Sequence, residues 1–129
     1  MIENCFTLTL DGPIVPKARA RVTRNGAYHP PEYSQWKTQA ILKLGSQYDG
    51  PSLSGVAIDI TLNGKHSRRG DLDNVIGSLL DALVQAHILK NDNLTCVTSL
   101  NAKLNWSKKA EPETKIQIFQ ATRLKTGDS

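Results

Sequence analysis

The chain has 129 residues, of which 39% are hydrophobic and 22% charged, and its formal net charge is +4 at pH 7. These values predict one domain, 1–129, with enough core to fold on its own, and they argue against wholesale disorder. No apolar run approaches the roughly 20 residues of a membrane helix, the start lacks the pattern of a signal peptide, and two cysteines are too few for a disulfide scaffold.

The first half of the chain is predicted to form a strand, a long loop and a helix. Between residues 6 and 10, large apolar residues alternate with threonines, as in a strand with one buried face. Residues 13–31 are rich in proline, glycine and basic residues and are predicted to be an exposed basic loop. A loop of this length in a compact domain is usually functional or disordered. Residues 32–48 carry apolar side chains at helical spacing and predict an amphipathic helix.

The second half is predicted to form a strand, a helix and two further strands. Strict alternation over 55–63 indicates a strand, and the spacing of three and four over 71–86 indicates a helix. Alternation predicts further strands at 100–106 and 114–121, followed by a polar tail, 122–129. The order β-α-β-α-β-β predicts an α+β domain, in which two main helices pack on one mixed sheet.

The charges are unevenly distributed along the chain. Basic side chains are concentrated in 13–48 and 65–70, and aspartates are concentrated in 71–92. Cationic segments beside a group of aspartates suit a protein that holds a polyanion next to metal-binding carboxylates. An ordinary basic protein with solvated faces would show the same net charge, so charge alone leaves both interpretations open.

A possible metal site is indicated by two acidic segments. Asp71, Asp73 and Asn74 stand where a turn leads into the predicted second helix, and Asn91 and Asp92 stand just beyond its end. Mg²⁺ typically takes one or two carboxylates together with phosphate and water oxygens. Asp92 can join the first group only where the chain doubles back. The alternative is that these aspartates only cap a helix and form a turn.

Three other positions in this region have open roles. Asp81, in the middle of the helix, is a metal ligand, a residue that supports the ligands, or the partner of a basic side chain; the supporting role is favoured, since such carboxylates are ordinarily solvated or paired. Gly77 costs the helix about 1 kcal/mol relative to alanine; it either allows close approach of another backbone or a substrate, or is merely tolerated there. Lys103 lies on the polar face of its strand, where it either stabilises a developing negative charge or faces solvent; the pattern favours solvent.

The basic segments are candidate contacts for a phosphate backbone. Lys17, Arg19 and Arg21 are spaced two apart, so an extended chain would direct all three to the same side. A solvated loop is the alternative. The predicted DNA-binding residues are Lys17, Arg19, Arg21, Arg24, Lys65, Arg68 and Arg69.

Three segments together resemble the RusA family of Holliday junction resolvases. VPKARARVTRNGAYHPPEYSQWK, residues 15–37, is similar to the family's Pro-Lys-x-Arg-x-Arg stretch and the turn that follows it. GDLDNVIGSLLDAL, residues 70–83, resembles its Asp-Leu-Asp-Asn motif at the start of a helix and is the most specific of the three. Residues 90–92 resemble its Asp-Asp turn, which precedes a strand with a lysine, here Lys103.

The resemblance implies a Mg²⁺-dependent homodimer, with Mn²⁺ as an alternative ion, that cuts four-way DNA junctions symmetrically by phosphodiester hydrolysis in recombination and repair. It implies no organic cofactor, no membrane partner and a cytoplasmic location in a bacterial or phage-infected cell. Carried over by position, the catalytic metal-binding residues are Asp71, Asp73 and Asp92. The supporting residues are Asn74, Asp81, Asn91 and Lys103.

Two departures from the family pattern keep alternative functions open. Gly77 stands where the family usually has a lysine, and Lys90, Lys103 and Lys17 are the candidates to replace its charge. Asn91 stands where the family has the first acid of its Asp-Asp pair. The alternatives are a weakly active or inactive protein that binds branched DNA, and a nuclease for other branched DNA such as flaps.

Overall fold

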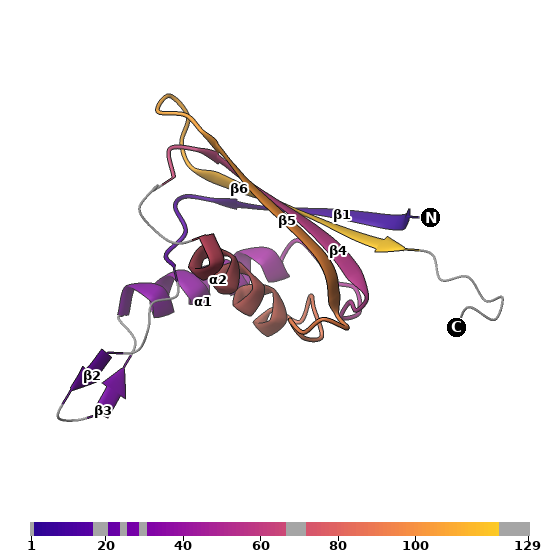
Figure 1. Ribbon diagram of the computed structural model, residues 1–129, viewed down its shortest axis with the longest axis horizontal. Coiled ribbons are helices and arrows are strands. Elements are labelled where there is room, and N and C mark those ends of the chain that lie inside the picture. The colour runs from indigo at the N-terminus through magenta and orange to yellow at the C-terminus, as the bar shows by residue number, and fades with distance from the viewer. Residues whose placement is uncertain (1, 17–20, 24–25, 29–30, 67–71, 122–129) are drawn as a thin grey trace.

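The elements of the fold follow the predicted order with one addition. The computed structural model describes residues 2–16, 21–23, 26–28, 31–66 and 72–121. Its elements are β1 (Ile2–Asp11), β2 (Arg21–Thr23), β3 (Gly26–Tyr28), α1 (Pro31–Gly45), β4 (Val56–Gly64), α2 (Leu72–Gln85), β5 (Val97–Trp106) and β6 (Glu113–Ala121). The addition is the small antiparallel hairpin of β2 and β3, which lies within the stretch predicted to be a loop (Figure 1).

A four-stranded mixed sheet forms one layer, and both helices cover one of its faces (Figure 1). The strand order is β1-β6-β4-β5. β6 runs antiparallel to both of its neighbours, whereas β4 and β5 are parallel. Parallel neighbours need a long crossover, and α2 provides it. This confirms the predicted α+β fold and leaves β5 at an edge of the sheet.

The core lies between the sheet and the helices. Side chains of β4 alternate between buried and partly exposed along the whole strand, as its period-two pattern predicted. Helix α2 buries the stripe that its spacing of three and four indicated. The central members of the core, all of them almost completely buried, are Leu8, Leu44, Val56, Ile58, Ile60, Leu79, Leu83, Ile88, Ile116 and Ile118.

The end of α2 directs the chain toward the beginning of β4. His87 has a φ of 63°, in the left-handed region. Its N–H bonds to the carbonyl of Val84 at 3.0 Å, and the N–H of Ile88 bonds to that of Leu83 at 3.0 Å. These two bonds form the Schellman motif that commonly ends helices. The next residue, Leu89, forms a parallel bridge to Leu53, just before β4 begins.

The apolar face of β5 is more exposed than its pattern predicted. Leu100 and Leu104 are each 40% exposed, and Trp106 is 37% exposed. They point to the same face as the buried residues of β4, because Ile58 pairs with Leu100 and Leu62 with Leu104. The difference arises because β5 is an edge strand, so its inward face has a covered neighbour on one side only.

Candidate active site

The first turn of α2 carries the part of the acidic motif that the structure describes. Asp73 and Asn74 are both exposed there, while Asp71 lies outside the described residues. The Oδ1 atom of Asp73 accepts the backbone N–H of Asn74 at 3.0 Å. One turn further on is Gly77, where an added Cβ would meet no atom of the described residues within 4 Å apart from its own helix. The helix N-terminus also attracts anions, because its first N–H groups lack helical partners.

Asp92 lies at the other end of α2. The N–H of Lys90 bonds to the carbonyl of Leu53 at 3.0 Å, which fixes this segment beside the start of β4. Asn91 and Asp92 follow immediately and are exposed. The Oδ1 atom of Asn91 accepts the N–H of Asp92 at 2.7 Å, so this oxygen is already used within the turn.

Among the described residues, the start of α2, with Asp73, and the segment beyond its end, with Asp92, are therefore at opposite ends of the helix; Figure 1 shows the course of α2. Helix α2 has 14 residues, and at about 1.5 Å per residue its length is roughly 20 Å. Asp73 is in its first turn, whereas Asp92 is seven residues beyond its last residue, Gln85. The chain does double back along β5, which runs parallel to β4, but Asp92 precedes β5. Among the described residues, no three His, Cys, Asp or Glu side chains form a group that could hold a metal ion.

The predicted DNA-binding residues lie mostly outside the described part of the chain. Lys17, Arg19, Arg24, Arg68 and Arg69 are outside it, and of Arg21 the structure describes the strand β2 but not the side chain. Lys65 is described and exposed, and its N–H bonds to the carbonyl of Ala110 at 3.0 Å. It comes directly after β4, on the path toward α2.

The segment just before Lys17, the first cation of the basic loop, is attached to α2. The Oγ atom of Ser78 lies 3.1 Å from the carbonyl oxygen of Val15 and 3.0 Å from that of Asn74. Ser78 is completely buried, and Ile14, next to Val15, belongs to the core. The start of the basic stretch is thus held close to the helix that begins with the acidic motif.

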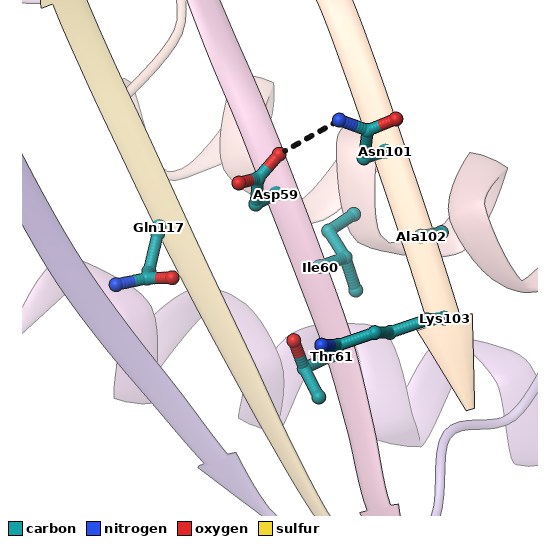
Figure 2. A pocket seen from close by; sticks show the side chains of 7 residues that line it. All are labelled: Asp59, Ile60, Thr61, Asn101, Ala102, Lys103 and Gln117. Carbon is teal, nitrogen blue, oxygen red and sulfur yellow. Dashed lines mark hydrogen bonds between the residues drawn. The ribbon is translucent and has the colours of Figure 1, made fainter. Parts of the chain in front are cut away.

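Lys103 lies on the face of the sheet opposite to α2. It pairs with Thr61, whose neighbours Ile60 and Leu62 point to the helices. Figure 2 shows the Lys103 side chain lying across β4 beside Thr61, in a shallow polar pocket. In this pocket the Asn101 amide donates to Asp59 at 3.3 Å. Lys103 therefore does not reach Asp73 within one chain, in agreement with the solvent-facing alternative.

Asp81 accepts a hydrogen bond from a phenol on the other helix. The phenol of Tyr33, in the first turn of α1, donates to Oδ2 of Asp81 at 3.1 Å. Burial, followed by the negative charge of Asp81, raises the pKa of Tyr33 to about 12. This contact joins the two helices. The polar roles of Tyr33 and Ser78 were not predicted, because both residues fit the helical pattern and only the tertiary fold supplies their partners.

His66 is a structural residue and not a free phosphate contact. It precedes Arg68 and Arg69 in the sequence, but its side chain is buried. Its Nε2 atom lies 2.9 Å from the carbonyl oxygen of Glu113, and its own carbonyl accepts the indole N–H of Trp106 at 3.1 Å. These bonds tie the end of β4 to the start of β6 and the end of β5.

The chain matches known proteins over most of its length. Residues 11–119 match the family Endodeoxyribonuclease RusA. A crossover junction endodeoxyribonuclease RusA from Aquifex aeolicus (strain VF5) is 35% identical over 83 residues, which make up 62% of this chain and 66% of that protein. The chain thus spans just under two thirds of the length of this relative. No helix in the described part of the chain is long and apolar enough to cross a membrane. With its Asp-Leu-Asp-Asn run at the start of α2, the chain belongs to the RusA family of endodeoxyribonucleases.

Proposed function

We propose that the protein is a Mg²⁺-dependent endodeoxyribonuclease that cuts four-way DNA junctions symmetrically, as a homodimer, in recombination and repair in the cytoplasm. One observation carries this proposal: the run Asp71–Asn74, matched by the family, leads into α2, and the bond from Ser78 to Val15 holds the start of the basic stretch against the same helix. Carboxylates and phosphate-binding cations are thereby supplied from two segments that are far apart in sequence. The name of the Aquifex relative supports the choice of junction DNA.

The donor set at this end of α2 fits a hard divalent cation. Asp71 and Asp73 offer carboxylate oxygens, and Asn74 adds an amide oxygen. Two carboxylates, with a phosphate oxygen and waters, are what Mg²⁺ commonly takes, and Mn²⁺ accepts the same ligands. When bound, the ion lowers the pKa of a coordinated water and offsets charge that grows on the phosphate. The basic side chains of residues 17–24, together with Arg68 and Arg69, hold the DNA backbone in place.

We further propose that Asp92 acts at the site of the partner subunit. A Mg²⁺ ligand lies about 2.1 Å from the ion, whereas the length of α2, roughly 20 Å, separates Asp73 from the segment that carries Asp92. A two-fold axis that is perpendicular to α2 and passes beside its middle places the partner's α2 alongside it in the opposite direction. It would bring Asp92 of the partner subunit toward Asp73 of the first chain, and it would create two equivalent sites for a two-fold symmetric junction.

The apolar surface beside α2 favours contact with a second copy along this face. Six large hydrophobic side chains are exposed among the described residues, and five of them lie on β5, at the start of α2 or in the loop that joins the two. An edge strand with apolar side chains is also a natural surface for pairing with another chain. The five residues are Leu72, Leu94, Leu100, Leu104 and Trp106.

The dimer surface can be tested by a charge placed on β5. Leu104→Lys should yield monomers in sedimentation equilibrium while leaving the melting temperature of the monomer fold almost unchanged, because Leu104 is 40% exposed. Leu42→Lys on α1, which is 64% exposed, is the matched control and should leave the mass unchanged. A dimeric Leu104→Lys protein would place the interface elsewhere.

A second candidate function is binding of branched DNA without efficient cleavage. Two observations favour it: Gly77 supplies no charge one turn after Asp73, and Asn91 has lost a carboxylate and engages its oxygen within the turn. Incubation with a synthetic four-way junction, with and without Mg²⁺, separates the two functions. Flap and three-way substrates in the same assay, at one stated salt concentration, test the remaining alternative of another branched-DNA nuclease.

A further inference from the structure

Both ends of the basic stretch are attached to the same turn of α2. We call residues 17–30, between Pro16 and Pro31, the basic arm; it includes β2 and β3. Just before the arm, the carbonyl of Val15 accepts the hydroxyl of Ser78 at 3.1 Å. Just after the arm, the hydroxyl of Tyr33 donates to the carboxylate of Asp81 at 3.1 Å. Residues three apart on a helix lie one above the other, so the two attachments are neighbours on α2.

Burial and ring contacts restrict the partners that the two hydroxyls can have. Ser78 and Tyr33 are both buried, so each hydroxyl needs a partner within the protein. The Ser78 hydroxyl has two acceptors in reach, the carbonyl of Val15 at 3.1 Å and that of Asn74, one turn back on α2, at 3.0 Å. The ring of Tyr33 also stacks on Trp36, with centroids 6.2 Å apart, and the Lys37 ammonium lies 5.5 Å from its centroid. The phenol is thereby held in one orientation toward Asp81. The raised pKa of Tyr33 agrees with a neutral hydroxyl donating to a carboxylate.

We propose that Ser78, Tyr33 and Asp81 are positioning residues that clamp both ends of the basic arm to the helix carrying the acidic motif. This inference rests on the proposed function for its purpose, which is to hold the cations of the arm in a fixed relation to Asp71 and Asp73. It assigns Asp81 a role through Tyr33 and not through the metal. The bond from Tyr33 to Asp81 also joins α1 to α2 directly.

The alternative is that these three residues only stabilise the fold. The two roles differ in what the loss of a contact changes. Loss of a stabilising contact affects the unfolding of the whole domain. Loss of a clamp affects hydrogen exchange in the arm and the number of phosphates that the protein neutralises when it binds DNA. The second quantity is measured by the slope of log K against log salt, which falls when phosphate contacts are lost.

The test uses the full-length variants Ser78→Ala and Tyr33→Phe, singly and combined, with two controls. Thr38→Val removes a hydroxyl that bonds to the carbonyl of Ser34 within α1, away from the clamp. Asp81→Asn keeps an oxygen that can accept the hydroxyl of Tyr33, whereas Asp81→Leu does not. Hydrogen exchange of peptides covering 16–31 is measured for each variant, together with the melting temperature.

The clamp predicts that each lost hydroxyl speeds exchange in the arm by about five-fold, the factor expected for one net hydrogen bond, with a larger effect in the double variant. Asp81→Asn, which keeps an acceptor for the Tyr33 hydroxyl, should speed arm exchange less than Asp81→Leu, while Thr38→Val changes nothing in the arm. Arm exchange that stays at the wild-type rate in the double variant would overturn the clamp.

Junction binding without Mg²⁺ supplies the second readout and separates the two proposals. The double variant should bind a four-way junction more weakly and with a shallower salt slope than the wild type. An unchanged slope with faster arm exchange would show that the clamp does not serve DNA binding. Failure of the wild type itself to bind would refute the proposed function, and the exchange data would still decide whether the clamp exists.

Discussion

Two inactive variants should restore cleavage when they share a dimer. Asp73→Asn and Asp92→Asn each damage every site of their own homodimers. In a mixed dimer, one site combines both altered residues, and the other combines the intact Asp73 of one chain with the intact Asp92 of its partner. This prediction follows from α2, whose 14 residues, roughly 20 Å in length, lie between the two positions within a chain.

The size of the effect is set by the statistics of pairing. When the two variants are co-expressed in equal amounts and pair at random, about half of the dimers are mixed, and each has one intact site out of two. About one quarter of the wild-type number of sites should therefore be active. Because a mixed dimer has one intact site, its product should be a nicked junction and not a pair of resolved duplexes.

The assay is cleavage of a labelled synthetic four-way junction with Mg²⁺, analysed on native and denaturing gels. Asp73→Asn co-expressed with the double variant Asp73→Asn/Asp92→Asn is the matched control, since no pairing of these chains creates an intact site. Nicking by the first mixture and none by the control is the predicted result. Absence of nicking in both, with mixed dimers shown by mass, would refute a site shared between subunits.

Three further predictions concern single positions. Gly77→Lys and Gly77→Ala should both raise the free energy of unfolding, by up to about 1 kcal/mol, because a Cβ meets no atom of the described residues within 4 Å apart from its own helix. Only the lysine should speed junction cleavage, and equal cleavage rates would argue against a missing charge. Leu83→Ala should lower the free energy of unfolding in urea by about 2–5 kcal/mol, since Leu83 is completely buried. Leu42→Ala should change it by no more than about 0.5 kcal/mol, and similar losses in the two variants would contradict the described core. The folded-state pKa of Tyr33 is raised to about 12, so its contribution to stability is complete below pH 10 and is lost as the pH rises toward 12. The melting temperature of the wild type should therefore fall more steeply over that range than that of Tyr33→Phe, and parallel curves would contradict it.

Most elements of the fold could be predicted because their apolar patterns are long and regular. The alternation over residues 55–63 and the helical spacing over 71–86 each contain several matching positions, and both elements lie almost where they were expected. The hairpin of β2 and β3 was missed because strands of three residues are too short to show a period. The exposure of Trp106 depends on the position of β5 in the sheet, which the pattern of one strand does not contain.

The candidate site was predictable in its chemistry but not in its assembly. The placement of Asp73 at the start of a helix followed from the local sequence. The separation of Asp92 follows from the direction of α2 and from the turn at His87, which places the next segment beside Leu53. The partners of Ser78 and Tyr33 lie 63 and 48 residues away in sequence, so no local pattern could identify them.

Cleavage of a four-way junction by the wild type and by Asp73→Asn tests the central claim most directly. Asp59→Asn, which removes the same charge on the opposite face of the sheet, is the matched control. The wild type and Asp59→Asn should cut the junction at symmetric positions only when Mg²⁺ is added, while Asp73→Asn should bind it and leave it intact. Mg²⁺-dependent cutting by Asp73→Asn at the wild-type rate would contradict the assignment of the site.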